Sequence, residues 1–144
     1  TSPHFSWGIY LDDDQSYTVK TEYFAADGKT PALLETQMGD GTVHIRSYLP
    51  DRTLRTTDAD DVLSGVSGRD VFVLTPGGHD TVTNFQVGVD SLDLTAFGFS
   101  DAGDLAAAVR SVSATSIEIV LSLDESVLLR GVAIGDFASL DLAI

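Results

Sequence analysis

Apolar residues in the first 57 positions gather in short runs, which polar and turn-forming residues separate. Four runs are rich in aromatic and β-branched side chains, as is typical of strands; they cover residues 5–11, 16–24, 32–38 and 42–48. Asp27-Gly28 and Gly39-Asp40-Gly41 stand between runs, and such sequences supply the positive φ angles that tight hairpin turns require. The pattern predicts a β-meander over residues 1–57.

The pattern changes at residue 58, where single apolar residues alternate with glycine and aspartate. Three windows, residues 56–64, 65–73 and 75–83, each carry an aspartate in the sixth position and an apolar residue in the eighth. The aspartates are Asp61, Asp70 and Asp80, and the apolar residues are Leu63, Phe72 and Val82. We expect short strands here, joined by turns that contain glycine and aspartate.

The sequence after residue 83 predicts a strand and turn over residues 84–99, followed by one helix. Residues 101–110 are rich in alanine, Ser100 or Asp101 can cap the helix, and Asp104 lies in its first turn, where an acid is favourable. Apolar runs at 116–123 and 127–130 predict two strands. The chain is therefore expected to be all-β with a single helix.

Acidic residues dominate the charge of the chain and are unevenly distributed. Twenty-two acids against eight bases give a net charge of −14, and residues 58–144 hold 14 of the acids but three of the bases. Such a surface repels phosphate backbones, so we expect no nucleic-acid binding. The acids form either a solubilising surface, as in halophilic proteins, or a set of carboxylates that await divalent cations. Their position beside glycines favours the second interpretation.

Several classes of site are excluded by residues that the chain lacks. The absence of cysteine excludes disulfide bonds, thiolate catalysis and zinc sites built on cysteine. No apolar stretch approaches the roughly 20 residues of a membrane span, so we expect no membrane span. The three histidines, His4, His44 and His79, are scattered and form no His-Glu-x-x-His sequence. We expect them to be surface or strand residues.

The three windows resemble the nonapeptide Gly-Gly-x-Gly-x-Asp-x-(apolar)-x of RTX proteins, the hemolysin-type calcium-binding repeat. Glycine falls fourth in two windows, at Gly68 and Gly78, while the first window has none. Residues 84–99 resemble the segment that closes the roll in this family, with Asn84 in place of the usual aspartate. The resemblance covers residues 58–144. It implies a short parallel β-roll with a C-terminal cap that contains one helix, behind the N-terminal meander.

The resemblance also implies Ca²⁺ as the cofactor. Calcium takes six to eight oxygen ligands at about 2.3–2.6 Å, and a glycine-rich turn can direct backbone carbonyls inward. Turns on the same side of a roll share an ion, which pairs Asp61 with Asp80 and leaves Asp70 to a downstream partner. The candidate ligand residues are Asp58, Asp61, Asp70, Asp80, Asp90, Gly65, Gly68, Gly77 and Gly78. The alternative is a set of glycine and aspartate turns without metal.

The C-terminal residues resemble the end of RTX proteins that are exported by type I secretion. Residues 126–137 are similar to the family's final strand and turn, and residues 141–144 are an acid followed by three apolar residues. The resemblance implies a signal that the type I secretion apparatus reads, and a secreted, extracellular protein. We expect a non-catalytic module of a longer protein, which folds on calcium binding outside the cell.

Two other functions are compatible with the sequence. A polysaccharide-binding accessory module, similar to the R-modules of secreted alginate epimerases, would share the roll, and Trp7 and Tyr10 are its candidate glycan-binding residues. A small enzyme or adhesin fragment would use residues 1–57, where no catalytic constellation is visible. Glycan binding at Trp7 would favour the first of these alternatives.

Overall fold

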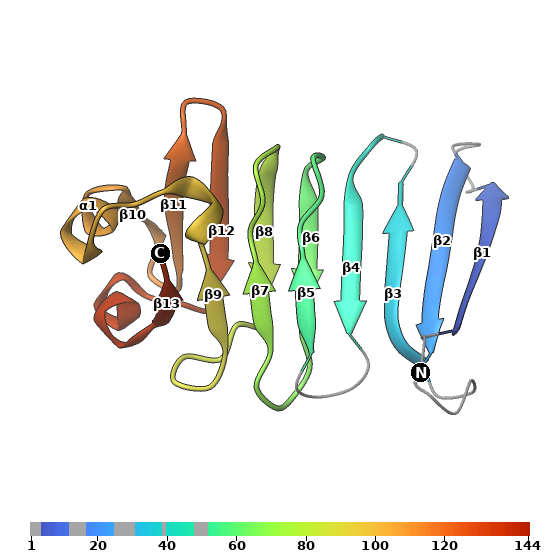
Figure 1. Ribbon diagram of the computed structural model, residues 1–144, viewed down its shortest axis with the longest axis horizontal. Coiled ribbons are helices and arrows are strands. Elements are labelled where there is room, and N and C mark those ends of the chain that lie inside the picture. The colour runs from blue at the N-terminus through green and yellow to red at the C-terminus, as the bar shows by residue number, and fades with distance from the viewer. Residues whose placement is uncertain (1–3, 12–16, 25–30, 39, 48–51) are drawn as a thin grey trace.

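Two β-sheets of unequal width form the structure, a computed structural model (Figure 1). It describes the backbone of residues 4–11, 17–24, 31–38, 40–47 and 52–144, and the side chains of these ranges from Leu33 onward. The larger sheet has nine strands in the order β1-β2-β3-β4-β6-β8-β12-β11-β10, and the smaller sheet has four in the order β13-β9-β7-β5. The all-β class expected from the sequence is confirmed.

The strands of the larger sheet are β1 (His4–Leu11), β2 (Tyr17–Phe24), β3 (Pro31–Gln37), β4 (Val43–Ser47), β6 (Asp61–Ser64), β8 (His79–Thr83), β10 (Val109–Ser113), β11 (Ser116–Ser122) and β12 (Glu125–Arg130). The smaller sheet contains β5 (Thr53–Arg55), β7 (Val71–Val73), β9 (Ser91–Asp93) and β13 (Asp141–Ala143). The helical segments are η1 (Thr95–Phe97), α1 (Ala102–Ala107) and η2 (Ile134–Ser139).

Strands β1 to β4 pair antiparallel in chain order, which is the meander that the apolar runs predict. From β4 onward the chain passes alternately between the two sheets. β4, β6 and β8 pair in parallel in the larger sheet, and β5, β7 and β9 do so in the smaller one. This is a parallel roll, in which each coil gives one strand to each sheet. The parallel pairing already includes β4 and β5, N-terminal to the boundary expected at residue 58.

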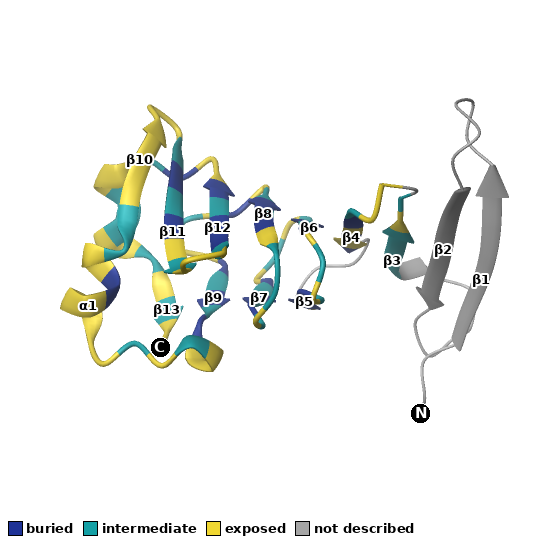
Figure 2. Cartoon of the chain, turned by 90° about the horizontal axis from the view of Figure 1, so that it is seen from above, coloured by how far each residue is buried: buried dark blue, intermediate teal, exposed yellow. Residues whose placement is uncertain are grey.

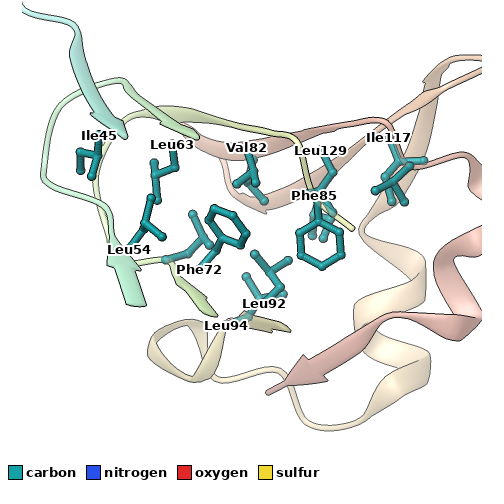
Figure 3. Close-up of a cluster of buried hydrophobic side chains, with 14 of the residues drawn as sticks. Ile45, Leu54, Leu63, Phe72, Val82, Phe85, Leu92, Leu94, Ile117 and Leu129 are labelled. Carbon is teal, nitrogen blue, oxygen red and sulfur yellow. The ribbon is translucent and has the colours of Figure 1, made fainter. Parts of the chain in front are cut away.

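Each short strand of the roll buries one apolar side chain between the sheets. Side chains alternate between the two faces of a strand, so the central residue of a three-residue strand points inward and its neighbours point outward. The inward residues of successive strands are fully or almost fully buried and stack in rows: Leu54, Leu63, Phe72, Val82 and Leu92 (Figure 3). Phe85 follows β8 and packs on Phe72, with 5.8 Å between the ring centres.

The C-terminal part of the chain covers one end of the roll. β12 pairs in parallel with β8 and continues antiparallel into β11 and β10, while β13 adds to β9. The predicted helix is present as α1, and the carboxylate of Asp101 caps it by accepting from the Asp104 N–H at 2.8 Å. The helix ends earlier than expected, because the chain enters β10 at the β-branched Val109.

The two ends of the roll differ in how they are closed. At the cap end, Leu105 of α1 and Ile117 of β11 are buried, and Figure 2 shows buried residues on both elements. At the other end the larger sheet continues through β3, β2 and β1, whereas the smaller sheet stops at β5. The smaller sheet therefore has an edge at β5 that lies opposite an extended part of the larger sheet.

Replacement of Phe72 by alanine tests how strongly the roll depends on its rows of inward residues. We expect Phe72→Ala to lower the free energy of unfolding by about 3–5 kcal/mol, because it leaves a cavity at the centre of the core. Urea denaturation measures the change, and Val112→Ala, at a position 54% exposed on β10, is the control. A loss below about 1 kcal/mol would contradict the central role of this row.

Candidate functional site

Four aspartates are buried in the roll, each at the point where a turn enters or approaches a strand. Their exposed fractions are 1% for Asp61, 0% for Asp70, 3% for Asp80 and 0% for Asp90. The remaining predicted aspartate, Asp58, is exposed in the turn before β6. A buried carboxylate is strongly unfavourable unless hydrogen bonds or opposite charges compensate it. The partners of these carboxylates therefore determine what the site can do.

The four carboxylates form two columns, one along each side of the roll. The Asp61 N–H donates to Oδ1 of Asp80 at 3.0 Å, and the Asp70 N–H donates to Oδ1 of Asp90 at 2.9 Å. The second column continues one step further, because the Arg52 N–H donates to Oδ1 of Asp70 at 3.0 Å. The spacing of the windows predicts the first pair, and Asp90 is the downstream residue that lies against Asp70. Each pair joins neighbouring coils.

A second donor comes from the turn that precedes each aspartate. The N–H groups of Thr57, Val66 and Gln86 donate to Oδ2 of the aspartates four residues later, at 2.6, 3.1 and 2.8 Å, respectively. In Asp70 and Asp90 each oxygen thus accepts from a different backbone amide, one from its own turn and one from another coil. This arrangement satisfies the carboxylate without a metal and holds the turn to the adjacent coil.

Asp80 departs from this arrangement because the residue four positions before it is Pro76, which has no N–H. Within the described residues, the Asp61 N–H is the one backbone donor that reaches its carboxylate. The pKa of Asp80 is raised to about 7, first by burial and further by the charge of Asp61 and by a hydrogen bond to the Asp61 carboxyl group. Burial also raises the pKa of Asp61. Ionisation of one carboxyl group therefore makes ionisation of the other less favourable.

Other acids lie close to this pair. The negative charge of Asp60 adds to the raised pKa of Asp80, and that of Asp58 adds to the raised pKa of Asp61. Asp60 itself accepts a hydrogen bond from the His79 N–H at 2.8 Å. The column of Asp61 and Asp80 consequently has more acids nearby than the column of Asp70 and Asp90. Asp80 also receives fewer backbone hydrogen bonds than Asp70 or Asp90 does.

The glycines of the third window allow two turns to approach closely. A Cβ atom at Gly77 would lie 2.6 Å from the Asp58 Cα, and one at Gly78 would lie 2.3 Å from the Ala59 carbonyl oxygen. Both glycines have positive φ angles, 124° and 78°, which residues with side chains rarely adopt. The backbone of the turn before β8 thus packs directly on the backbone of the turn before β6, beside Asp61 and Asp80.

The two glycines of the second window have different neighbours. A Cβ atom at Gly65 would lie 2.4 Å from Oδ2 of Asp70, so the absence of a side chain makes room for this carboxylate. Gly68 has a φ of 98° in the turn before Asp70. Among the described residues, no three His, Asp or Glu side chains are grouped so that they could hold a metal ion by themselves.

Sequence reasoning missed one polar contact on the outer face of the larger sheet. His79 Nδ1 lies 3.0 Å from Ser126 Oγ, across the parallel pair β8 and β12. The expected surface position of His79 agrees with its exposure. The predicted glycan-binding residues, Trp7 and Tyr10, lie outside the residues whose side chains the structure describes. Their role stays a prediction.

Comparison of the chain with protein-family models, with curated proteins and with solved structures finds no match. In the described part of the chain, no helix has the length and apolar character that a membrane crossing requires.

The unequal compensation of the aspartates predicts different effects for the same substitution. Asp90→Asn should lower the free energy of unfolding by about 1–3 kcal/mol. Each oxygen of Asp90 accepts from a backbone N–H, and in asparagine an NH2 group, itself a donor, would face one of these N–H groups. Asp80→Asn should lower the free energy of unfolding by less than about 1 kcal/mol at neutral pH. The oxygen that asparagine keeps can still accept the hydrogen bond from the Asp61 N–H. Urea denaturation in the presence of a chelator compares the two variants. An equal loss of unfolding free energy in both variants would contradict the idea that Asp80 and Asp90 differ in their hydrogen-bond partners.

The raised pKa of Asp80 predicts a dependence of stability on pH. The folded state holds a proton at Asp80 up to about pH 7, whereas the ordinary pKa is 3.8. Without divalent cations, stability should therefore fall as pH rises between these two values, since the folded state binds more protons there. Asp80→Asn should reduce this fall, while Asp93→Asn, at a carboxyl group whose pKa is lowered by hydrogen bonds from Thr95, should not. Denaturation midpoints of the wild-type protein and of both variants, measured across this pH range, test the prediction.

Proposed function

We propose that the protein is a non-catalytic calcium-binding module, in which the cation stabilises the parallel roll. The observation that supports this proposal best is the Asp61–Asp80 pair: two buried carboxyl groups on adjacent coils that share a hydrogen bond when one is protonated. A buried carboxyl group whose pKa is raised to about 7 beside a second acid is a natural place for a cation, because a cation would favour the ionised form.

The residues around this pair fit the requirements of Ca²⁺. Calcium binds carboxylate and backbone carbonyl oxygens, in six- to eight-fold coordination. The pair supplies the carboxylates, and Gly77 and Gly78 bring the backbone of one turn onto that of the next. Because side chains alone form no metal-binding group among the described residues, backbone carbonyls of the two turns would have to provide most of the ligands.

Calcium would supply positive charge to Asp61 and Asp80, which form no ion pair with any described residue. Residues 58–144 contain 14 acids and three bases, so the acids repel each other when the coils approach. The chain's own residues contribute the geometry: the Asp61 N–H orients the Asp80 carboxylate, and Thr57 orients that of Asp61 through its N–H and its hydroxyl group. A cation that binds only the folded roll would stabilise it by mass action.

Secretion is the part of the proposal that concerns the C-terminal residues. In the structure β13 pairs with β9, the Leu94 N–H donates to the Ala143 carbonyl at 2.7 Å, and Ser91 donates to the Asp141 carboxylate at 2.8 Å. A type I secretion apparatus that reads residues 141–144 would therefore have to bind them before the roll folds. Low calcium inside the cell and higher calcium outside would give that order.

A calcium titration tests the proposed function. We expect the free energy of unfolding to rise by about 2.7 kcal/mol at a calcium concentration one hundred times the Kd, and Mg²⁺ at equal concentration to have a smaller effect. Asp80→Asn should abolish most of the rise, whereas Asp93→Asn should retain it. Thermal denaturation followed by circular dichroism, with a chelator as reference, gives the measurement. An unchanged midpoint in wild-type protein would refute the proposal.

A further inference from the structure

The edge of the smaller sheet at β5 has unpaired backbone groups. β5 pairs with β7 on one side, where the Val71 N–H donates to the Arg52 carbonyl at 2.8 Å and the Thr56 N–H donates to the Val73 carbonyl at 3.0 Å. In a parallel pair, alternate residues direct their backbone groups to opposite sides of the strand. The N–H and C=O groups of Thr53 and Arg55 therefore point away from β7, where the sheet has no further strand among the described residues.

A pocket of about 310 Å³ lies beside this edge, between β5 and the inner face of β3 and β4. Its walls include the apolar residues Leu33, Ile45 and Leu54. Two charged residues of opposite sign, Glu35 and Arg55, also line it. In Figure 1 the larger sheet continues from β4 to β3, whereas β5 is the last strand of the smaller sheet among the described residues. One additional strand beside β5 would lie over this pocket.

Of the two charged residues in the pocket, Glu35 is the one on the inward face, where it pairs with the buried Ile45. Arg55 is exposed and acts on Asp93, which lies two strands away in the smaller sheet. The Glu35 side chain is half-buried, and its pKa is raised by burial and by the negative charge of Asp61. No described residue forms an ion pair with it. A lysine or arginine side chain suits such a pocket, because its aliphatic part packs on apolar walls while its charged end reaches the carboxylate.

The same coil contains further polar atoms without partners. In the described part of the chain, the buried side-chain atoms that lack a hydrogen bond are Ser47 Oγ and Arg52 Nε. Ser47 ends β4 and is fully buried, and Arg52 directly precedes β5. Buried polar groups are normally hydrogen-bonded. The coil at this end therefore has unpaired buried polar atoms that the described part of the following coils does not have.

We propose that the β5 edge and the adjoining pocket bind an extended basic peptide, which adds a strand to the smaller sheet and places a lysine or arginine side chain against Glu35. Backbone groups at strand spacing recognise a polypeptide rather than a sugar or a nucleotide. A second copy of this chain is disfavoured as the occupant, because it would bring a net charge of −14 to a protein of the same charge. This inference is independent of calcium binding.

The test uses two synthetic seven-residue peptides, Thr-Val-Thr-Lys-Thr-Val-Thr and the same sequence with a central Glu, each with blocked ends. We expect the lysine peptide to bind the full chain at least about tenfold more tightly, since its charge meets a half-buried carboxylate. In nuclear magnetic resonance spectra, the amide signals of Thr53 and Arg55 should shift, while that of Leu54, whose backbone faces β7, should change less.

Two variants separate the parts of the proposed site. Glu35→Gln should bring the two peptide affinities within about threefold of each other, because the charge preference is lost. Thr53→Pro should weaken both peptides by about tenfold, since it removes an outward N–H and leaves the bonds to β7 in place. Thr53→Ala is the matched control and should bind as wild type does, with an unchanged spectrum elsewhere.

Several results would overturn the inference. They are no binding of either peptide at millimolar concentration, equal binding of both by wild-type protein, or shifts confined to β10, the edge of the larger sheet. Self-association of wild-type protein in sedimentation experiments, abolished by Thr53→Pro, would replace the peptide by a second copy of the chain. Binding that survives Thr53→Pro would show that β5 is not the edge that is used.

Discussion

The hydrogen bonds between a buried aspartate and the backbone of the adjacent coil are the interaction on which this roll depends. Strands of three residues offer few ladder bonds and one inward apolar side chain, so neighbouring coils need another connection. Asp70 and Asp90 provide it, because each accepts one N–H from its own turn and one from another coil. The carboxylate fixes the shape of the turn and the register of the coils at once. This explains why an acid, ordinarily excluded from a protein interior, recurs at these positions.

The same interaction makes the first column the weak point of the roll. Asp80 has lost the donor from its own turn, and its neighbour Asp61 is a second buried acid. Without a cation the pair reduces its charge by holding a proton, as the raised pKa of Asp80 reflects. On this side the pairing of β6 with β8, the hydrogen bond from the Asp61 N–H and the burial of Leu63 and Val82 act against the repulsion between the two acids. A bound cation would reverse the sign of that electrostatic contribution, whereas the second column would gain little from one.

Much of this could be predicted from the sequence, because the aspartates and the inward residues recur at regular spacing. That spacing predicted that Asp61 would lie against Asp80 and that Asp70 would need a partner further along the chain, which in the structure is Asp90. The exception at Asp80 was also visible, since Pro76 occupies the position whose N–H would be needed. The participation of β4 and β5 in the roll could not be seen, because short strands in antiparallel and in parallel pairs have similar patterns. β5 contains no glycine or aspartate that would mark it as part of a repeat.

The two sheets differ in width because the chain changes from an antiparallel meander to a parallel roll. β1 to β4 pair antiparallel within the larger sheet, whereas from β4 onward successive strands alternate between the two sheets. Among the described residues no strand lies opposite β3, so Leu33 lines a pocket and Glu35 is half-buried there without an ion pair. An inward acid on a strand is unfavourable for the isolated chain, and aliphatic residues would have closed this end better. Its presence is understandable if that position meets a positive charge, which is the chemistry proposed for the β5 edge.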